Sequence, residues 1–569
     1  MTDAQTSSGA NEESDSGTSK ITTRAALKSA FKDRQVLAML ILGIASGLPY
    51  AAVGGTLNAW LTTVGVKPVA IGLLSWALLA YAFKFMWAAA LQSHKTPLNL
   101  SIGPRRFWMA VFLLLVTLGL LAIALSDPPN GLAAIGLISV LIAVFSASFD
   151  IVLAAWRIEI ARDDTHLDIL STVEQFGYRI ASWVAGFIAL IAADHLGWRV
   201  TFTGLALLMG TTLIGVVLAK ASPVAAKASQ STGGGADLKQ GRNLTDGQRS
   251  IGTVLTLMGW ALAFWLIGSF MFGALSDPES YSARDFIRRQ GPVVILSTVV
   301  WLGVVSAVLV WLNGRGDNAE PAPAKSSVLT VLYRAVMEPM MELIGRLRWV
   351  TILVVMVVLS YRFTDLIWGG FAYPFYLGEN FGALGHTLTE VGFASKLMGV
   401  IATIVGIALG GLAMLRFGRM PVFFLGAVLA AATNLLFADL AMNAGFTDAV
   451  LGFTQLDDVF AAFGLDIRMA RLTSVIFAEN LAVGLASAAS IAYLSSIVNK
   501  DYAAVQYALL VSLVMLLGVL GRPTIGAIIE TQGFARAFII CAWLGGIAAV
   551  LALIEWIRLD FLGKNKTNP

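Results

Sequence analysis

Apolar residues follow one another in long runs along most of the chain, and short polar segments separate these runs. An α-helix needs roughly 20 apolar residues to cross the hydrocarbon core of a bilayer. Membrane β-strands would instead alternate apolar and polar residues over shorter segments, so the pattern favours helices. About fourteen transmembrane helices are predicted, at about 36-64, 69-92, 107-126, 132-156, 169-193, 199-219, 252-274, 292-312, 349-371, 388-415, 421-442, 471-496, 502-528 and 535-557.

Two polar segments divide the predicted helices into groups of six, two and six. A Gly/Ser-rich stretch follows the sixth helix, and a stretch containing PAPAK follows the eighth. Such compositions are typical of linkers. The predicted division is a disordered cytoplasmic tail (1-35), a six-helix half (36-220), a cytoplasmic linker (221-250), two inserted helices (251-313), a cytoplasmic linker with an amphipathic helix (314-348), a second six-helix half (349-558) and a cytoplasmic tail (559-569).

Composition and charge agree with a polytopic membrane protein. Apolar residues make up 57% of the 569 residues and charged residues only 13%, which is unlike a soluble domain. Most of the 39 Lys and Arg residues lie on the side of the predicted N-terminal tail, so the positive-inside rule predicts that both termini are cytoplasmic. The net charge of +4 reflects this bias and gives no indication of nucleic-acid binding. The single cysteine, Cys541, excludes an intramolecular disulfide.

The two six-helix halves, joined by a long cytoplasmic segment, resemble the major facilitator superfamily, whose halves rock around a central site. The stretch GLAMLRFGR at 411-419 matches the superfamily loop G-x-x-x-D-R-x-G-R, except that Leu415 stands where the acid belongs. A weaker copy in the first half keeps Gly103, Arg105 and Arg106. The resemblance implies a major facilitator fold that works by alternating access.

Glycines at a spacing of four predict close contacts between helices. Gly43 and Gly47 form one G-x-x-x-G pair, and Gly406 and Gly410 form another. Such pairs let two helix backbones approach each other, so we expect helix packing there more than substrate contact.

Charged residues inside the predicted helices are the candidate functional residues, because a charge near the bilayer centre costs a few kcal/mol or more. Arg362 and Asp365 are three residues apart and can pair on one helix face. Asp150 and Lys84 have similar predicted depths, and an acid beside a cation can hold or release a proton as its neighbour is engaged. A static ion pair is the alternative in both cases. The candidates for proton coupling are Asp150, Glu479 and Asp365.

Four intramembrane cations indicate an anionic substrate, because Arg and Lys in a partly desolvated cavity bind carboxylates or phosphates strongly. The alternative is that four intramembrane carboxylates, Glu174 among them, neutralise all four cations. The chain has no nucleotide-binding loop and no soluble catalytic domain, so we expect a protein that is not an enzyme and needs no cofactor or metal. The candidate anion-binding residues are Lys84, Arg179, Arg362 and Lys396.

An ordered set of motifs across both halves resembles the AmpG-type muropeptide permeases. The resemblance implies import of anhydromuropeptides across the bacterial inner membrane in symport with protons. Partners would be this anionic glycopeptide, protons and the lipid bilayer, and we expect a monomer. The glycopeptide would offer amides and hydroxyls to Gln175, Asn480 and Gln506. The motifs are ASGLP (45-49), GGTLNAW (54-60), FKFxW (83-87), SASxDIV with AW (146-156), GYR (177-179), YRxxD (361-365), KxxGxIATIVG (396-406), ENL (479-481), QYALL (506-510) and GR (521-522).

The chain departs from this family in two respects. Phe149 and Ala154 stand in the fourth helix where the family usually has a glutamine and a second acid. The two extra helices lie between the halves instead of at the C-terminus, so we do not expect them to line a shared site. The alternatives are a transporter of the same fold for another bulky anion, such as a siderophore or acyl-CoA, and a non-transporting receptor or assembly protein.

Overall fold

The computed structural model describes eleven stretches of the chain, and within them the regular secondary structure is helical, without a β-strand. The predicted tail residues 1-32 and the linker residues 221-242 lie outside the described residues. The described residues are 33-84, 87, 91, 103-128, 131-162, 164-220, 243-277, 281, 283-315, 328-499 and 503-567.

The helices of the first half follow the predicted apolar runs, and several contain a short π-helical or 3₁₀ turn. They are α2 (Arg34–Ala51), η1 (Ala52–Thr56), α3 (Leu57–Thr63), α4 (Pro68–Leu74), η2 (Ser75–Leu78), α5 (Leu79–Phe83), α7 (Pro104–Ala124), α8 (Leu132–Ile160), α9 (Asp164–Trp183), η3 (Val184–Ile188), α10 (Ala189–Leu196), α11 (Trp198–Thr211) and α12 (Leu213–Leu218).

The inserted region and the second half are helical as well. The inserted region consists of α14 (Asp246–Ser276), α15 (Ala283–Arg289), α16 (Gly291–Ile295), η4 (Leu296–Val300), α17 (Trp301–Asn313), α18 (Val328–Leu332), η5 (Tyr333–Met337) and α19 (Glu338–Leu347). The second half consists of α20 (Val350–Tyr361), α21 (Phe363–Trp368), η6 (Gly369–Phe371), α22 (Ala372–Leu377), α23 (Leu388–Val391), η7 (Gly392–Met398), α24 (Gly399–Phe417), α25 (Arg419–Met442), α26 (Gly445–Thr454), α27 (Leu456–Ala462), α28 (Ile467–Ile497) and α29 (Ala503–Thr567).

Each of the fourteen predicted ranges contains helix within the described part of the chain. By length and apolar composition, 11 described helices could cross a membrane, or 12 if the bent pair Tyr333–Leu347 and Val350–Tyr361 is one span. Two predicted spans are merged in α29, whose backbone turns at Gly533. The short apolar helix Pro68–Phe83 accounts for one further predicted span. The prediction of an all-helical, multi-pass membrane protein is therefore confirmed.

Equivalent turns in the two halves use glycine in the same backbone conformation. Gly103 precedes α7 and Gly418 precedes α25, with φ of 82° and 83°. Gly197 precedes α11, and Gly533 interrupts α29, with φ of 82° and 80°. Side chains disfavour positive φ, so these turns require glycine. The agreement between the halves supports a repeated architecture.

The predicted G-x-x-x-G contacts hold two helix pairs together. A Cβ on Gly43 would lie 2.5 Å from the carbonyl oxygen of Glu174, so α2 packs closely on α9. In the second half, a Cβ on Gly406 would collide with the carbonyl oxygen of Leu481, so α24 packs equally closely on α28. The predicted close packing is therefore confirmed in both halves.

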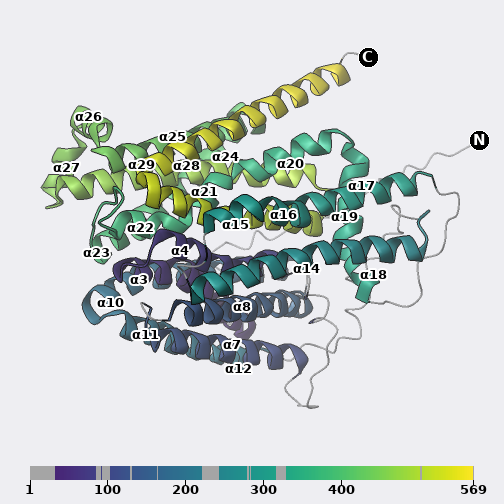
Figure 1. The fold of residues 1–569 in the computed structure, drawn as a ribbon, viewed down its shortest axis with the longest axis horizontal. Helices are drawn as coiled ribbons and strands as arrows, with labels where there is room; N and C mark the ends of the chain where they lie inside the picture. Colours follow the sequence, from purple (N-terminus) through teal and green to yellow (C-terminus); the bar gives the residue numbers. More distant parts are fainter. Residues whose placement is uncertain are drawn as a thin grey trace, which may run out of the picture.

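Figure 1 shows the first half in purple and blue, the second half in green and yellow, and the inserted helices in teal between and in front of them. The inserted helix α14 packs on α8 of the first half, and α15 packs on α29 of the second half. The helix α19 runs across the long helices and meets the next helix at a bend of 119°. The inserted region therefore contacts both halves at one side of the bundle.

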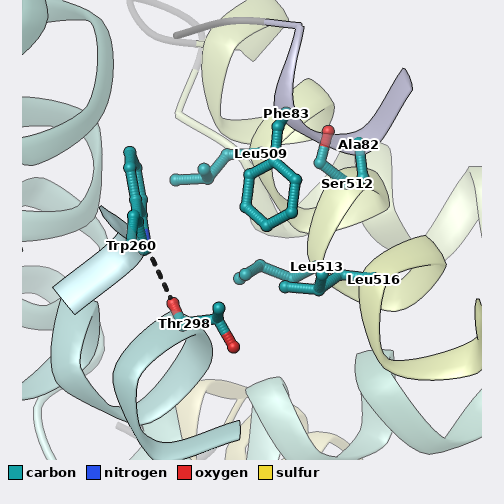
Figure 2. Close-up of a pocket in the computed structure, with 8 residues that line it drawn as sticks. All are labelled: Ala82, Phe83, Trp260, Thr298, Leu509, Ser512, Leu513 and Leu516. Carbon is teal, nitrogen blue, oxygen red and sulfur yellow. Dashed lines mark hydrogen bonds between the residues drawn. The ribbon is translucent and has the colours of Figure 1, made fainter. Parts of the chain in front are cut away.

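A small pocket lies where the inserted helices meet both halves (Figure 2). Ala82 and Phe83 come from α5, Trp260 and Thr298 come from the inserted helices, and the other lining residues belong to α29. The indole nitrogen of Trp260 donates to the carbonyl oxygen of Thr298 at 3.2 Å. Because its walls are almost entirely apolar, this pocket offers nothing to hold a charged substrate, and we interpret it as a packing junction.

Candidate functional site

An acid and a cation meet inside the first half. Asp150 lies on α8, and one of its carboxylate oxygens accepts a hydrogen bond from the hydroxyl of Ser46 on α2 at 2.6 Å. Its other oxygen lies 3.9 Å from the ammonium nitrogen of Lys84, which follows α5. The Lys84 side chain is 43% exposed, whereas that of Asp150 is 19% exposed. The depth argument from the sequence therefore predicted a real contact, although 3.9 Å is long for an ion pair.

Two tyrosines interact with this acid and a third contacts one of them, and the sequence analysis did not identify any of the three. The rings of Tyr50 and Tyr81 meet edge to face, with their centroids 5.3 Å apart. Tyr81 and Tyr178 both interact electrostatically with Asp150. Tyr50 directly follows the ASGLP motif and Tyr178 lies within the GYR motif, so these two motifs could have indicated the tyrosine cluster.

The helix α9 carries a second group of polar residues. Glu174 forms an ion pair of 2.6 Å with Arg157 on α8, so Arg157 is its partner within the membrane. Arg179 is exposed and forms no ion pair within the described residues, and Gln175 is exposed as well. Arg179 and Trp183 are four apart and share a helix face. Because the indole nitrogen of Trp183 donates to the carbonyl oxygen of Lys396 at 3.1 Å, that face is directed toward the second half.

The second half has its own group of charges where its first helix breaks. Arg362 separates α20 from α21, and its guanidinium lies 3.1 Å from a carboxylate oxygen of Asp365. The same guanidinium donates to the hydroxyl of Ser487 and, at 3.4 Å, to the carbonyl oxygen of Val483, both on α28. The pairing predicted from the three-residue spacing is confirmed.

Glu479 extends this group toward Lys396. Glu479 interacts electrostatically with Asp365, Arg362 and Lys396. The side-chain nitrogen of Asn480 donates to Glu479 at 2.6 Å. The ammonium group of Lys396 lies 5.5 Å from the ring centre of Tyr373, within the range of a cation–π contact. Each half therefore presents at least one acid beside a cation within its helices.

Gln506 lies apart from these two groups. It is 1% exposed, and its side-chain nitrogen donates to Glu342 at 2.6 Å and to the carbonyl oxygen of Pro339 at 2.9 Å. Its side-chain oxygen accepts from the backbone of Asn499 at 2.8 Å. Gln506, at the start of α29, is therefore hydrogen-bonded to α19. It does not lie beside the other candidate residues.

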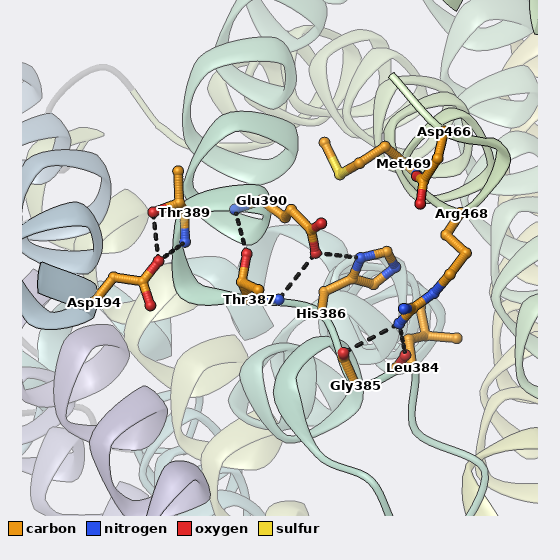
Figure 3. A network of polar contacts seen from close by, with 10 residues as sticks. All are labelled: Asp194, Leu384, Gly385, His386, Thr387, Thr389, Glu390, Asp466, Arg468 and Met469. Atoms are coloured by element: carbon orange, nitrogen blue, oxygen red, sulfur yellow. Dashed lines mark hydrogen bonds and ion pairs between the residues drawn. The ribbon is translucent and has the colours of Figure 1, made fainter. Parts of the chain in front are cut away.

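Hydrogen bonds between the two halves gather toward the end of the bundle that carries α10, α23, α26 and α27, which we call the outer end (Figure 1). Asp194 at the end of α10 accepts from the backbone nitrogen of Thr389 at 3.2 Å and from its hydroxyl at 2.5 Å (Figure 3). On the other side, Glu530 of α29 accepts from the backbone nitrogen of Val69 at 2.9 Å. Each half thus supplies one carboxylate to the first turn of a helix in the other half, where unpaired backbone N–H groups favour negative charge.

The loop before α23 supports the contact of Asp194. The hydroxyl of Thr387 accepts from the backbone of Glu390, whose carboxylate in return accepts from the backbone of Thr387. The same carboxylate lies 2.9 Å from His386, and Arg468 donates to the carbonyl oxygens of two loop residues (Figure 3). Burial lowers the pKa of His386 below its ordinary value, although Glu390 opposes this shift. The loop is therefore fixed by several polar contacts.

Comparison with known proteins gives relatives that cover most of the chain, although no family model matches. The transporter AmpG 4 of Rickettsia felis is 23% identical over 536 residues, which are 94% of this chain and 98% of the relative. The anhydromuropeptide permease of Escherichia coli K12 is 24% identical over 538 residues, covering 93% of this chain and 82% of the permease.

Solved structures of transporters share the fold. A POT-family peptide transporter in an auto-inhibited form superposes with a TM-score of 0.59 at 14% identity, covering 93% of this chain and 97% of that structure. The nucleoside transporter NupG gives a TM-score of 0.51 at 11% identity, covering 92% and 99%. These relatives are transporters and not enzymes, in agreement with the expectation that the protein is not an enzyme. The chain is thus a multi-pass membrane transporter with the major facilitator fold, similar over most of its length to AmpG transporters and anhydromuropeptide permeases.

Proposed function

We propose that the protein imports anhydromuropeptides across the bacterial inner membrane in symport with protons, by alternating access between its two halves. The similarity to an anhydromuropeptide permease over 93% of the chain supports the substrate. The acids and cations inside both halves support an ionic substrate and a coupled proton. Both termini would then be cytoplasmic, and the outer end would face the periplasm.

Cations that are accessible between the halves support an anionic cargo. Arg179 is exposed on a helix face directed at the second half and has no ion-pair partner among the described residues. Lys84 is 43% exposed in its side chain and is only loosely paired. Anhydromuropeptides carry carboxylates on their peptide portion, which these cations would bind. Gln175, which is exposed, and Asn480, which is partly buried, would supply hydrogen bonds to amides and hydroxyls.

The observation that carries the coupling proposal is the position of Asp150 between Ser46 and Lys84. While Lys84 lies near it, the carboxylate is stabilised in its charged form. A substrate carboxylate that attracts Lys84 would remove this stabilisation, and Asp150 would then bind a proton. Substrate and proton would therefore enter the site together. Glu479 and Asp365, which interact with Lys396 and Arg362, would make the same exchange in the second half.

The contacts between the halves support a state that is closed at the outer end and open to the cytoplasm. Asp194 and Glu530 tie the halves together at the outer end. Lys84 and Arg179, which lie farther from the outer end, have exposed side chains. Release of the two outer contacts would open the site to the periplasm and complete the transport cycle.

Uptake of labelled anhydromuropeptide into proteoliposomes tests this proposal. We expect the wild type to accumulate the substrate only under an imposed inward proton gradient. Asp150→Asn should allow the substrate to equilibrate without accumulation, whereas Asp458→Asn, a change at an exposed carboxylate on α27, should behave as wild type. Absence of uptake by folded wild type would exclude this cargo. In a competition assay, unlabelled siderophore, acyl-CoA or muropeptide would be added to the labelled substrate. If the siderophore or the acyl-CoA inhibits uptake more strongly than unlabelled muropeptide, that anion would be the favoured cargo.

A further inference from the structure

One buried arginine within the helices has no counter-ion among the residues that the structure describes. Arg522 lies on α29 and is 6% exposed. Its Nε donates to the carbonyl oxygen of Leu366 on α21 at 3.0 Å. One terminal nitrogen, Nη1, is buried without a hydrogen-bond partner, and the side chain forms no ion pair within the described stretches.

The guanidinium lies where the two halves meet. On one side is Gly370 of η6, where a Cβ would come within 3.0 Å to 3.3 Å of the Arg522 side chain, so a glycine is needed to make room for it. Tyr50 of α2 in the first half interacts with it electrostatically. Tyr50 also contacts Tyr81, which borders Asp150. A Cβ on Gly72 of α4 in the first half would lie 3.2 Å from the backbone carbonyl carbon of Arg522, so the two halves pack against each other at this arginine. Tyr50 links Arg522 to the residues around the proposed coupling acid.

This arrangement differs from that of two other intramembrane cations, which have a carboxylate beside them, and from that of Arg179, which is exposed. Arg362 has Asp365 beside it, and Lys84 has Asp150. A buried cation without an opposite charge is strongly unfavourable, because little of its lost hydration is replaced. An arginine also presents several N–H groups in a planar fork that matches the two oxygens of a carboxylate. The missing partner of Arg522 is therefore expected to be a planar anion.

We infer that Arg522 binds a carboxylate on the peptide portion of the transported substrate, between the two halves. This inference rests on the proposed function, because it takes the cargo to be an acidic glycopeptide. It adds a specificity-determining residue to the site. A cargo whose peptide carboxylates are neutral would leave the arginine unpaired and would bind more weakly.

The test compares two labelled anhydromuropeptides, one with free peptide carboxylates and one with the same carboxylates amidated. KM for uptake into proteoliposomes and binding to the purified protein are measured for each. We expect the wild type to favour the free acid by about 10- to 100-fold, the range for a hydrogen-bonded charge. Arg522→Gln should lower this ratio by about 10-fold, because Lys84 and Arg179 still favour the free acid, and it should leave the KM for the amidated substrate nearly unchanged.

Two further variants separate binding from structure. Arg522→Lys keeps the charge but loses the planar fork, so we expect an intermediate ratio. Arg536→Gln changes an exposed arginine on the same helix and should keep the wild-type ratio. An unchanged ratio in both Arg522 variants would overturn the inference while leaving the proposed function intact. If the wild type takes up neither substrate, the proposed function fails and the inference fails with it.

Discussion

Removing the negative charge of Asp194 or Glu530 should open the outer end of the transporter. Both carboxylates hold the first turn of a helix in the opposite half, so both contacts must break before the two halves can separate at this end. Asp194→Asn and Glu530→Gln keep the size of each side chain and one acceptor oxygen. They remove the negative charge, which interacts favourably with the positive end of the helix dipole at the N-terminus.

The size of the effect follows from the contacts. Asp194 accepts two bonds from Thr389 but is exposed to solvent, and Glu530 accepts one bond and is partly buried. Solvent screening limits each contribution to about 1 kcal/mol. Each variant should therefore shift the ratio of outward-open to inward-open protein by about fivefold. The two sites share no partner, so the double variant should shift the ratio by about 30-fold.

Spin labels at Arg199 and Arg536, exposed residues of the first and second halves at the outer end, would report the change as a longer distance between them. We expect the long-distance population to grow in each variant and to grow most in the double variant. Asp458→Asn, which removes an exposed charge at the same end, should leave the distances unchanged. Distances in the double variant identical to those of the wild type would refute the role of these carboxylates in closing the outer end.

Two further predictions concern the stability of the fold. Because burial lowers the pKa of His386, unfolding takes up a proton, so stability should fall as the pH drops through about 6.5. Melting temperatures should therefore fall more steeply with acidification in the wild type than in His386→Gln, and equal slopes would contradict the assignment. Gly43→Ala should cost about 1–3 kcal/mol, because the new methyl group meets the backbone of Glu174. Gly411→Ala, which meets nothing within 4 Å, should melt as wild type, and equal melting of both variants would show that α2 and α9 can separate at no cost.

Local regularities in the sequence predicted part of the candidate site. A helix repeats nearly every 3.6 residues, so the spacing of Arg362 and Asp365 was sufficient to predict their contact. A fixed rise per residue placed Lys84 and Asp150 at the same depth, and the structure brings them together. The glycine pairs predicted close packing for the same reason. These predictions needed only the geometry of a helix and the direction in which it crosses the membrane.

Contacts that depend on how helices turn toward one another could not be predicted in this way. Glu174 pairs with Arg157 across a turn between two helices, and the sequence does not give the rotation of α9 that permits this. The outer contacts join residues 195 and 461 positions apart. Gln506 was predicted to bind the substrate, but its side chain forms hydrogen bonds with α19, which packs on α29. The helices α26 and α27 lie between the predicted spans 421-442 and 471-496, where no helix was predicted.

Proton movement driven by the substrate alone would test coupled muropeptide transport most directly. Proteoliposomes containing a pH-sensitive dye would receive anhydromuropeptide on the outside, with no imposed proton gradient. We predict that the lumen of wild-type vesicles becomes acidic as the substrate enters, and that Asp150→Asn vesicles take up the substrate without acidification. Substrate entry into wild-type vesicles at constant internal pH would contradict proton symport.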